Sequence, residues 1–313
     1  MPSVKTISTA APSTGLLGVS VQNSLASAPD DVAPTLPSMN PYTPENRTID
    51  IFARGSGAVD YKILSPAKYV KTTPSSGTVS YPSGTSDVRA IISVDWALAP
   101  TGPSNVTVTV KPKNGTTVTL GLFLNNFAVP AGFKGYVESN GVVAMEMQHF
   151  TTRVTGTAGA TTEVIPNYGR TDSGLTLMPS TAGTQTLASA PRAMYSFYAV
   201  TSGPANLTVY LPPSFNVNPS TPLKYAIALD NATPTTVVPV PSAALGSMPA
   251  GWETSVVNGA RVVTTSLGRI EPGKHELSLW LLEPGTVVQR LVIDLGGLKS
   301  SYLGPPESTK VGF

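Results

Sequence analysis

Short stretches of alternating apolar and polar residues, separated by proline and glycine, limit the folds open to this chain. Its 313 residues contain 28 glycines and 30 prolines. Three alternating stretches are Thr48–Ala53, Val59–Leu64 and Val106–Val110. Side chains of a β-strand point to opposite faces in turn, so this period of two predicts strands. Nothing has the spacing of a helix longer than a turn or two, and the sequence therefore predicts an all-β protein.

The charged residues argue against several classes of partner. They make up 12% of the chain, and the net charge is +2. Because lysine and arginine form no cluster, we expect no nucleic-acid partner and no membrane-surface partner. No window reaches about 18 apolar residues, so we expect no transmembrane span. The absence of cysteine excludes disulfides, zinc–thiolate sites and a thiol nucleophile.

The first half of the chain predicts an immunoglobulin-like sandwich over residues 46–130. Together with the three stretches above, four more predicted strands give a set of seven or eight: Val70–Thr73, Thr78–Tyr81, Arg89–Trp96 and Thr116–Leu124. Trp96 is expected in the core. Residues 1–45 are rich in serine, proline and alanine and predict an extended segment that packs on the first sandwich or links to it, with one strand in Gly15–Gln22.

The second half, residues 131–313, predicts a jelly roll. It opens on a β-hairpin with strands Phe133–Glu138 and Val142–His149 around an Asn140-Gly141 turn. Trp280, Tyr198 and Tyr225 alternate within strands, so we assign them to the core. Six further strands are predicted at 193–200, 205–211, 223–229, 260–266, 275–282 and 287–295.

Five Asn-x-Thr sequons leave the cellular location open, at Asn46, Asn105, Asn114, Asn206 and Asn231. One interpretation is a glycosylated secreted protein, and the other is chance in a chain rich in serine and threonine. Residues 1–6 contain no apolar h-region, so no signal peptide is predicted in this chain. A secreted or extracellular location is our expectation.

The hairpin also carries a family resemblance. The turn Val137–Gly141 followed by Glu146-x-x-His-Phe150 resembles the opening of the C-terminal domain of glycoside hydrolase family 115, the xylan α-glucuronidases. Further similar stretches follow the family's order along nearly the whole chain: Pro41–Gly55, Ser75–Thr78, Ser93–Trp96, Gly273–His275, Glu283–Gly285 and Ser301–Glu307.

This resemblance implies a function for a longer enzyme. In the family, two β-domains follow an N-terminal domain, a catalytic (β/α)₈ barrel and a helical region, none of which is recognisable here. The enzymes remove glucuronic or 4-O-methyl-glucuronic acid from xylan by inverting hydrolysis without a cofactor. The implied partners are xylan or another plant cell-wall polysaccharide, and the missing catalytic domain or a homodimer partner.

The second half also resembles carbohydrate-binding module families 6 and 35, whose first strand carries a Glu-x-Glu that binds a structural calcium together with an Asp near the last strand. The corresponding positions are Glu146, Gln148 and, near the last strand, Gln289. Two of the three carboxylates are neutral amides, and calcium prefers several charged oxygens. We therefore predict no cofactor and no metal; Glu146 is the remaining candidate ligand for a structural calcium. Asp294 is expected to face another direction.

Candidate catalytic residues are few. Glu138 and Glu146 flank the hairpin and could face each other as glycosidase carboxylates do, but a turn acid and a strand-end acid are the simpler interpretation. His149 and His275 lack a Gly-x-Ser-x-Gly elbow, so no serine triad is predicted. We predict no catalytic residue, and we expect this chain to be inactive alone.

Sugar-binding modules stack pyranose faces on exposed aromatic rings. Our candidates are Trp252, in a Pro-Ala-Gly-Trp-Glu stretch, and Tyr168 with Arg170, in a Pro-Asn-Tyr-Gly-Arg loop, with Tyr302 as a further aromatic candidate. Arg170 would suit the carboxylate of a uronic acid. The competing interpretations are a core position for Trp252 and an ordinary solvated loop for Tyr168 and Arg170.

Three functional hypotheses follow. The first is a non-catalytic scaffold, dimer-interface or accessory module of a glucuronoxylan hydrolase. The alternative is a free-standing carbohydrate-binding protein, recognisable by an exposed aromatic and arginine cluster near Tyr168 or Trp252. A third is a structural all-β surface or capsid protein, which the composition alone would permit.

Overall fold

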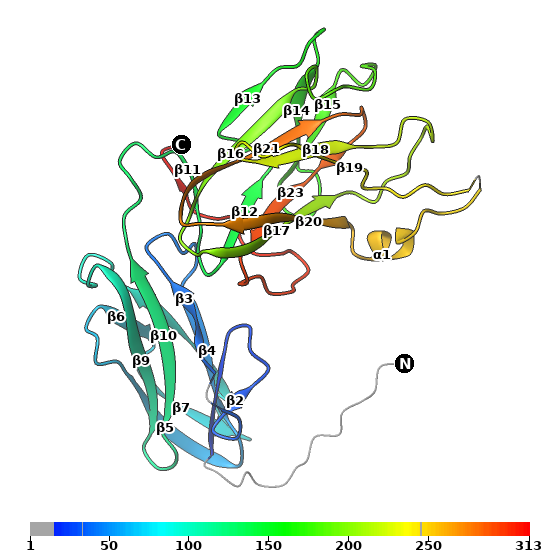
Figure 1. The fold of residues 1–313 in the computed structure, drawn as a ribbon. Coiled ribbons are helices and arrows are strands. Elements are labelled where there is room, and N and C mark those ends of the chain that lie inside the picture. Colours follow the sequence, from blue (N-terminus) through cyan, green and yellow to red (C-terminus); the bar gives the residue numbers. More distant parts are fainter. Residues whose placement is uncertain (1–15, 33, 245) are drawn as a thin grey trace. The chain divides into compact units, whose positions relative to one another are not determined.

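The computed structural model describes residues 16–32, 34–244 and 246–313. The chain forms two compact units (Figure 1). Unit 1 runs to Pro41 and continues over Glu45–Ala128, and unit 2 comprises Tyr42–Pro44 and Val129–Phe313. Both units are built from strands, so the protein is all-β, as its alternating pattern predicts: an immunoglobulin-like sandwich followed by a galactose-binding-type jelly roll.

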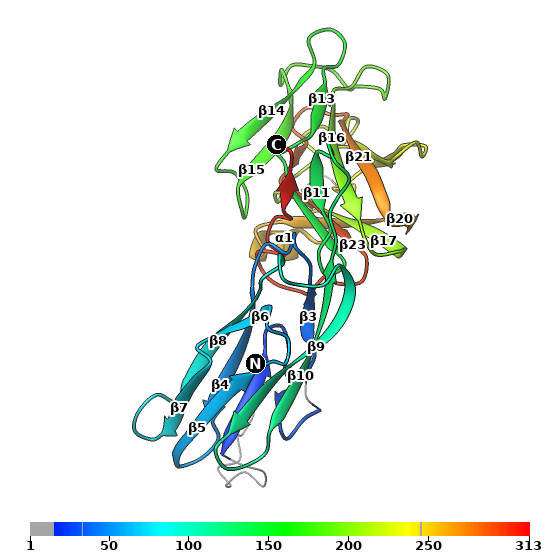
Figure 2. The same cartoon turned by 90° about the vertical axis from the view of Figure 1, so that its left-hand side faces the viewer.

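Unit 1 consists of two five-stranded sheets (Figure 2). The first has the order β2-β1-β4-β8-β6 and contains β1 (Leu17–Val21), β2 (Ser27–Ala28), β4 (Arg47–Ala53), β6 (Val70–Thr73) and β8 (Asp87–Val94). The second has the order β3-β10-β9-β5-β7 and contains β3 (Leu36–Met39), β5 (Gly57–Leu64), β7 (Ser76–Tyr81), β9 (Gly102–Pro112) and β10 (Val118–Asn126).

The strand alternation produces the core of unit 1. In β5, Val59, Tyr61 and Ile63 are buried while the residues between them are exposed. Side chains of this inward set pack against those of the other sheet, and partly buried Trp96 packs against the same cluster. Strands β1, β2 and β3 show that the described part of residues 1–45 contributes to both sheets.

Unit 2 has three sheets. The seven-stranded sheet has the order β19-β18-β21-β16-β11-β24 with β13 on β16, the four-stranded sheet β12-β23-β17-β20, and the three-stranded sheet β14-β15-β22. The strands are β11 (Gly135–Val137), β12 (Val142–Glu146), β13 (Thr152–Val154), β14 (Thr161–Pro166), β15 (Ser173–Met178), β16 (Arg192–Ala199), β17 (Gly203–Leu211), β18 (Tyr225–Leu229), β19 (Thr235–Val237), β20 (Arg261–Ile270), β21 (Gly273–Leu281), β22 (Val287–Val288), β23 (Arg290–Asp294) and β24 (Lys310–Val311).

The hairpin predicted at 133–149 is only partly correct. Asn140 and Gly141 have φ of 53° and 72°, as the predicted turn requires. Beyond the single bridge Ser139–Val142, however, the two strands separate. Strand β11 pairs with β16 and β24, whereas β12 pairs with β23 in another sheet. Both strands are buried along their whole length, so each is completed by a different sheet rather than by the other.

The three aromatic residues assigned to the core of unit 2 differ in burial. Tyr225 is fully buried in the main core, and Trp280 lies in a smaller cluster with Ala226 and Ala228. Tyr198 is only half-buried and packs edge-on against Phe133, with ring centroids 5.8 Å apart. The core assignment therefore holds for Trp280 and Tyr225 and fails in part for Tyr198.

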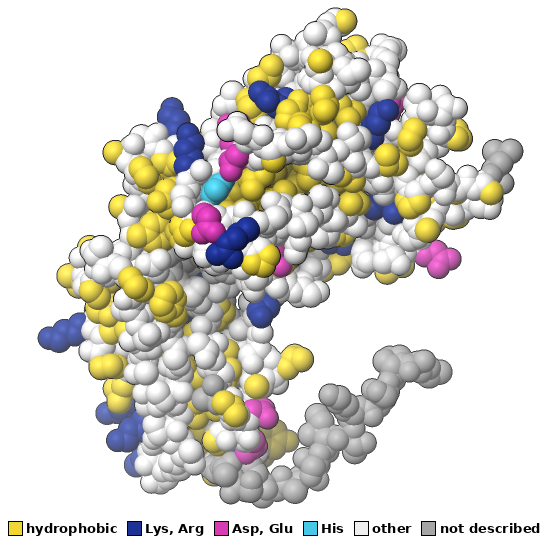
Figure 3. Space-filling view, viewed as in Figure 1, with side chains coloured by type: hydrophobic (Ala, Val, Ile, Leu, Met, Phe, Trp, Pro, Cys, Tyr) yellow, Lys and Arg dark blue, Asp and Glu magenta, His cyan; other side chains and the backbone are white. Residues whose placement is uncertain are grey.

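The described residues contain one α-helix, α1 (Trp252–Val257). Within those residues no helix is long and apolar enough to cross a membrane. Figure 3 shows charged side chains scattered over the face that it presents, mostly singly or in small mixed groups.

A close backbone contact holds the 139–142 turn in place, and it can be tested. A Cβ added at Gly297 would lie 1.6 Å from the Asn140 carbonyl oxygen, whereas one added at Gly183 meets nothing within 4 Å. We therefore expect Gly297→Ala to lower the free energy of unfolding by roughly 1–3 kcal/mol, and Gly183→Ala to leave it nearly unchanged. Urea unfolding of the two variants measures this, and equal stability would contradict the contact.

Candidate functional site

Arg170 lies in the loop between β14 and β15, as predicted, but its guanidinium already has protein partners. Its Nε donates to the Asn258 carbonyl oxygen at 2.7 Å and its Nη1 to that of Tyr302 at 2.6 Å. Its Nη2 also donates to Asn258. The group stacks over the Tyr302 ring, 4.5 Å from the centroid. Arg170 thus joins its loop to the end of α1 and to the C-terminal segment, and its donors face backbone carbonyls rather than an open sugar site.

Tyr168 is half-buried within the same loop. Its backbone N–H donates to the Asp172 carbonyl oxygen at 3.2 Å and closes the loop. Its ring covers Gly174, where an added Cβ would lie 2.9 Å from Tyr168 Cδ1. Gly174 leaves room for the ring, so the ring packs on the backbone of β15. The structure brings Tyr168, Arg170 and Tyr302 into one region but uses Arg170 and Tyr302 to hold each other.

Trp252 is not in a loop: it is the first residue of α1. Its half-buried ring stacks on Phe215, with centroids 3.9 Å apart and planes inclined by 29°. Phe215 comes from the segment between β17 and β18 and is 41% exposed. The contact partner of Trp252 was not among the sequence candidates, because nothing in the local pattern around Phe215 marks it.

Glu146, at the end of β12, is buried and paired with Arg290. The Arg290 Nε lies 3.1 Å from Glu146 Oε1, and the two side chains are 5% and 6% exposed. Thr171 Oγ1 donates to the other carboxylate oxygen at 2.9 Å. Arg290 also donates to the carbonyl oxygens of Leu303 (2.7 Å) and Pro305. Arg290 therefore neutralises Glu146 and fastens the C-terminal segment at the same time.

Glu307 is the second acid of this buried network. Its Oε1 accepts from the Tyr136 hydroxyl at 3.0 Å and from the Glu146 backbone N–H at 3.3 Å, and lies 2.7 Å from His149 Nδ1. Its Oε2 lies 3.4 Å from Lys310 Nζ. The family-like stretch ending at Glu307 thus closes on the first strands of unit 2.

The two acids have opposite pKa shifts. Burial raises the pKa of Glu146 above its ordinary value, although Arg290 and Thr171 act in the other direction. Burial also acts to raise the pKa of Glu307, but the hydrogen bond and charge of His149, with Lys310 and Tyr136, outweigh it. The pKa of Glu307 therefore lies below its ordinary value.

The positions that correspond to a calcium site do not fit that ion. The Glu146 carboxylate faces a guanidinium, and Gln148 Nε2 donates to the Asp172 carboxylate. Gln289 Oε1 is buried and has no hydrogen-bond partner among the described residues, and its side chain packs against the Gly169 backbone. Among the residues that the structure describes, no three acidic or histidine side chains are placed to hold a metal. Asp294 accepts from the N–H groups of Gly296 and Leu298 instead.

The remaining acid and histidine candidates have structural partners. Glu138 is fully buried and accepts from the backbone N–H groups of Val200 (2.6 Å) and Thr201 (2.8 Å) between β16 and β17. It is a turn acid, which was the simpler interpretation. His275 lies 2.8 Å from the Asp230 carboxylate and 2.7 Å from the Glu271 carbonyl oxygen.

Comparison with known proteins identifies the jelly roll. A model of the glycosyl hydrolase family 115 C-terminal domain matches residues 135–307, which is more than half of the chain. Unit 2 is therefore a carbohydrate-related β-domain. The chain belongs to the family of the glycosyl hydrolase family 115 C-terminal domain.

Solved structures with a similar arrangement are distant in sequence. A family 115 4-O-methyl-α-glucuronidase with specificity for decorated arabinogalactans is 13% identical over 54% of this chain, with a TM-score of 0.38. The chain spans 19% of the length of that enzyme. A carbohydrate-binding module of Cellvibrio mixtus lichenase 5A, in complex with cellotriose, is 10% identical over 51% of this chain and 98% of its own, with a TM-score of 0.31.

A family 35 carbohydrate-binding module from Clostridium thermocellum is also 10% identical, over 48% of this chain and 97% of its own, with a TM-score of 0.33. No curated protein matches the sequence.

The Arg290–Glu146 pair predicts a strong asymmetry between single and double variants. Arg290→Met leaves the Glu146 carboxylate buried and unpaired, so we expect a loss of roughly 3–5 kcal/mol of unfolding free energy. The double variant Glu146→Gln/Arg290→Met leaves no buried charge and should be more stable than Arg290→Met alone. Denaturant unfolding of the wild type, both single variants and the double variant measures this. If the stability loss of the double variant equalled the sum of the losses of the two single variants, the pairing would be contradicted.

Glu307 predicts part of the acid sensitivity. Because its folded-state pKa is depressed, the unfolded chain binds more protons, and stability falls as pH drops from the ordinary glutamate value of about 4.3. We expect Glu307→Gln to be less stable at neutral pH and to lose less stability in acid. Glu146 has the opposite effect: because its folded-state pKa is raised, stability falls as pH rises from the ordinary glutamate value toward that raised pKa.

The measurement is urea unfolding from pH 7 to pH 3. Glu163→Gln, an exposed substitution on β14, is the matched control and should follow the wild type. If the unfolding free energy of Glu307→Gln fell with decreasing pH as steeply as that of the wild type, the depressed pKa of Glu307 would be contradicted.

Proposed function

We propose that this chain is the non-catalytic C-terminal β-domain portion of an α-glucuronidase-like hydrolase that acts on glucuronoxylan. In this proposal it serves as a scaffold, a dimer interface or an accessory module. The observation that supports it is the family match over residues 135–307. The proposed partners are xylan or another plant cell-wall polysaccharide, together with a catalytic domain or a second copy of the chain. A secreted location accompanies the proposal.

The use of the acids in unit 2 is consistent with a non-catalytic role. An inverting glycosidase needs one carboxyl group to protonate the leaving group and another to activate water. Glu138 accepts two backbone N–H groups, and Glu146 faces Arg290. Glu307 is shared between Tyr136, His149 and Lys310. Each of these acids is engaged in holding loops and strands together, and none is placed as a free partner of another.

The domain arrangement proposed with this function follows the sequence. It consists of a segment over 1–45, whose described strands β1, β2 and β3 belong to the sheets of unit 1, an immunoglobulin-like sandwich over 46–130 and the family domain over 131–313. The strands of unit 1 support the second assignment, and the family match supports the third.

A free-standing carbohydrate-binding protein is the second candidate function. The aromatic pair Phe215–Trp252 favours it, because Phe215 exposes 41% of its surface beside polar loops of unit 2. Tyr168 and Arg170 contribute less to this candidate, since each guanidinium nitrogen of Arg170 already donates to a backbone carbonyl oxygen.

A release assay tests the proposed function. The purified chain is incubated with glucuronoxylan, and free glucuronic and 4-O-methyl-glucuronic acid are measured. We expect no release above a buffer blank, because the proposed role needs a catalytic domain in addition to this chain. Release by the pure chain that scales with its concentration would contradict the proposal.

Light scattering and a polysaccharide pull-down on the same sample separate the two candidates. A dimer, or association with a separately purified catalytic domain, supports the scaffold or interface role. A monomer that sediments with insoluble xylan and does not associate with that domain supports the free-standing binding protein.

A further inference from the structure

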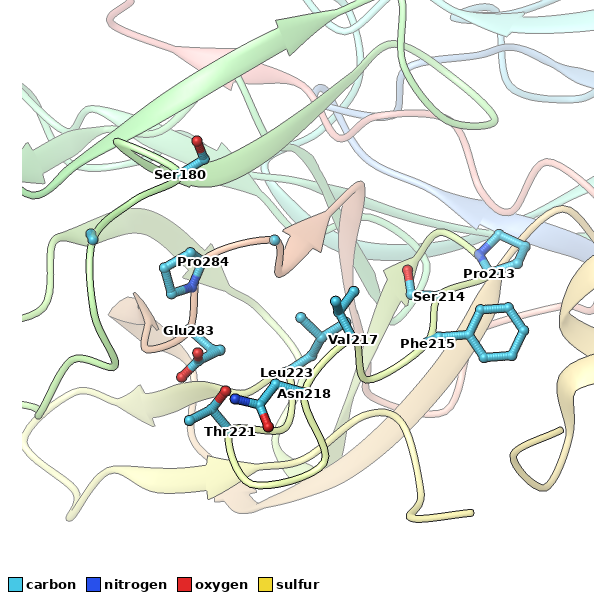
Figure 4. A pocket seen from close by; sticks show the side chains of 12 residues that line it. Ser180, Pro213, Ser214, Phe215, Val217, Asn218, Thr221, Leu223, Glu283 and Pro284 are labelled. Atoms are coloured by element: carbon cyan, nitrogen blue, oxygen red, sulfur yellow. The ribbon is translucent and has the colours of Figure 1, made fainter. Parts of the chain in front are cut away.

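A groove in unit 2 is separate from Tyr168, Arg170 and the buried acid network, although its turn Glu283–Gly285 is one of the family-like stretches. Its volume is about 510 Å³, within the range of about 300–1,000 Å³ typical of small-ligand sites. Three segments form it: the one after β15, the one between β17 and β18, and the turn between β21 and β22 (Figure 4). The lining includes Ser180, Phe215, Asn218, Thr221 and Glu283.

One end of the groove is polar. Figure 4 shows the side chains of Glu283, Thr221 and Asn218 close to one another. Glu283 is 8% exposed, and its Oε2 accepts from Thr184 Oγ1 at 2.6 Å. Among the described residues its Oε1 has no hydrogen-bond donor. Asn218 uses its Oδ1 to accept from the Ser220 N–H at 3.0 Å, so its amide NH₂ is left to donate.

The other end is apolar and flat. Phe215 and Pro213 lie there in Figure 4, away from the Glu283 cluster. The Phe215 ring is held from behind by its stack on Trp252. Phe215 is 41% exposed, and an exposed aromatic ring can pack against the C–H face of a ligand. The groove thus has hydrogen-bonding groups at one end and an aromatic surface at the other. This combination suits a molecule that has both hydroxyl groups and a C–H face.

Hydrogen bonds within the protein hold the loops that form the groove. The Glu283–Thr286 segment is a turn in which the Thr286 N–H donates to the Glu283 carbonyl oxygen at 3.2 Å. Pro284 precedes Gly285, whose φ of 84° suits the third position of a type II turn. Thr286 Oγ1 in turn accepts from the Lys224 N–H at 3.2 Å.

Asn216 holds the opposite wall. Its Nδ2 donates to the Val240 carbonyl oxygen and its Oδ1 accepts from the Leu223 N–H, both at 3.0 Å. Because these loops are held by hydrogen bonds of their own, a ligand would not need to order them, and affinity would not be lost to that ordering.

We propose that this groove binds a neutral saccharide. Glu283 accepts hydrogen bonds from sugar hydroxyls, the Asn218 amide donates to them, and Phe215 packs on the C–H face of a pyranose ring. Glu283 is the one charged residue among the lining residues that the structure describes. A uronic-acid carboxylate would face its negative charge with no cation beside it.

The groove therefore selects the uncharged backbone of a polysaccharide over its acidic side groups. This inference rests on the proposed function, which supplies the polysaccharide. It adds where on the chain the polysaccharide would bind and which of its sugars would be contacted.

Isothermal titration of the full chain tests the proposal with three probes. They are a neutral xylo-oligosaccharide, a neutral cello-oligosaccharide and free glucuronic acid. We expect saturable binding of at least one neutral oligosaccharide and weaker or no binding of glucuronic acid. Glu283→Gln keeps the Thr184 contact but removes the charge, and should weaken neutral binding about tenfold or more, as expected for losing a hydrogen bond to a charged acceptor.

Two further variants keep the test independent of folding defects. Phe215→Ala removes the ring and should also weaken neutral binding about tenfold. Asn218→Asp keeps the Oδ1 acceptor for Ser220, removes the amide donor, and should reduce binding as well. Glu163→Gln, an exposed acid on β14, is the control and should bind as the wild type does. Thermal unfolding of each variant confirms that the fold is retained.

Two results would overturn the proposal: no binding of either neutral oligosaccharide, or wild-type affinity in Glu283→Gln. Neither result bears on the accessory role, because the release, light-scattering and catalytic-domain association measurements do not use this groove. Conversely, release of glucuronic acid by the pure chain would overturn the proposed function and leave the titration result standing.

Discussion

The buried contact between Arg290 and Glu146 is the interaction on which the arrangement of unit 2 depends. Arg290 begins β23 and Glu146 ends β12, so the pair joins two neighbouring strands of the four-stranded sheet. The same guanidinium donates to two carbonyl oxygens of the C-terminal segment. That segment then delivers Glu307 to Tyr136 and His149. Burying such charges is costly unless each is paired, so the network fixes one arrangement of its three segments.

This use of charge limits the chemistry of the domain. Carboxylates that could have formed a hydrolytic pair or a calcium site are engaged with a guanidinium, with backbone N–H groups or with a histidine. The same holds for Arg170, whose donors face backbone carbonyls. Glu283 differs, because one of its oxygens lines a groove whose opposite end is aromatic. The proposed recognition of a saccharide therefore rests on Glu283 and not on these engaged acids.

Much of the fold could be predicted from the sequence, because a period of two and a Pro/Gly turn are local properties. Strands such as β5 and β9 were predicted for that reason. The partner of a strand is not local: the Asn140-Gly141 turn forms as predicted, yet β11 and β12 enter different sheets. Strands β14 and β15 escaped prediction because β14 is mostly half-buried and β15 is buried on both faces, so neither shows a clear alternation.

The candidate site was less predictable than the fold. Tyr168 and Arg170 do lie in a loop, but the carbonyl oxygens of Asn258 and Tyr302, which occupy Arg170, are 88 and 132 residues away in sequence. Trp252 starts a six-residue helix that carries no strong sequence signal. Glu283 and Phe215 come together only through three segments that the topology brings to one place.

Thermal unfolding of the wild-type chain in excess EDTA and in excess Ca²⁺ tests most directly whether an internal guanidinium, rather than a bound ion, neutralises Glu146. An ion that binds only the folded state raises the melting temperature with its concentration. Because Arg290 already occupies that role, the melting temperature should be the same in both conditions. A rise that saturates with Ca²⁺ and is abolished by Glu146→Gln would contradict it.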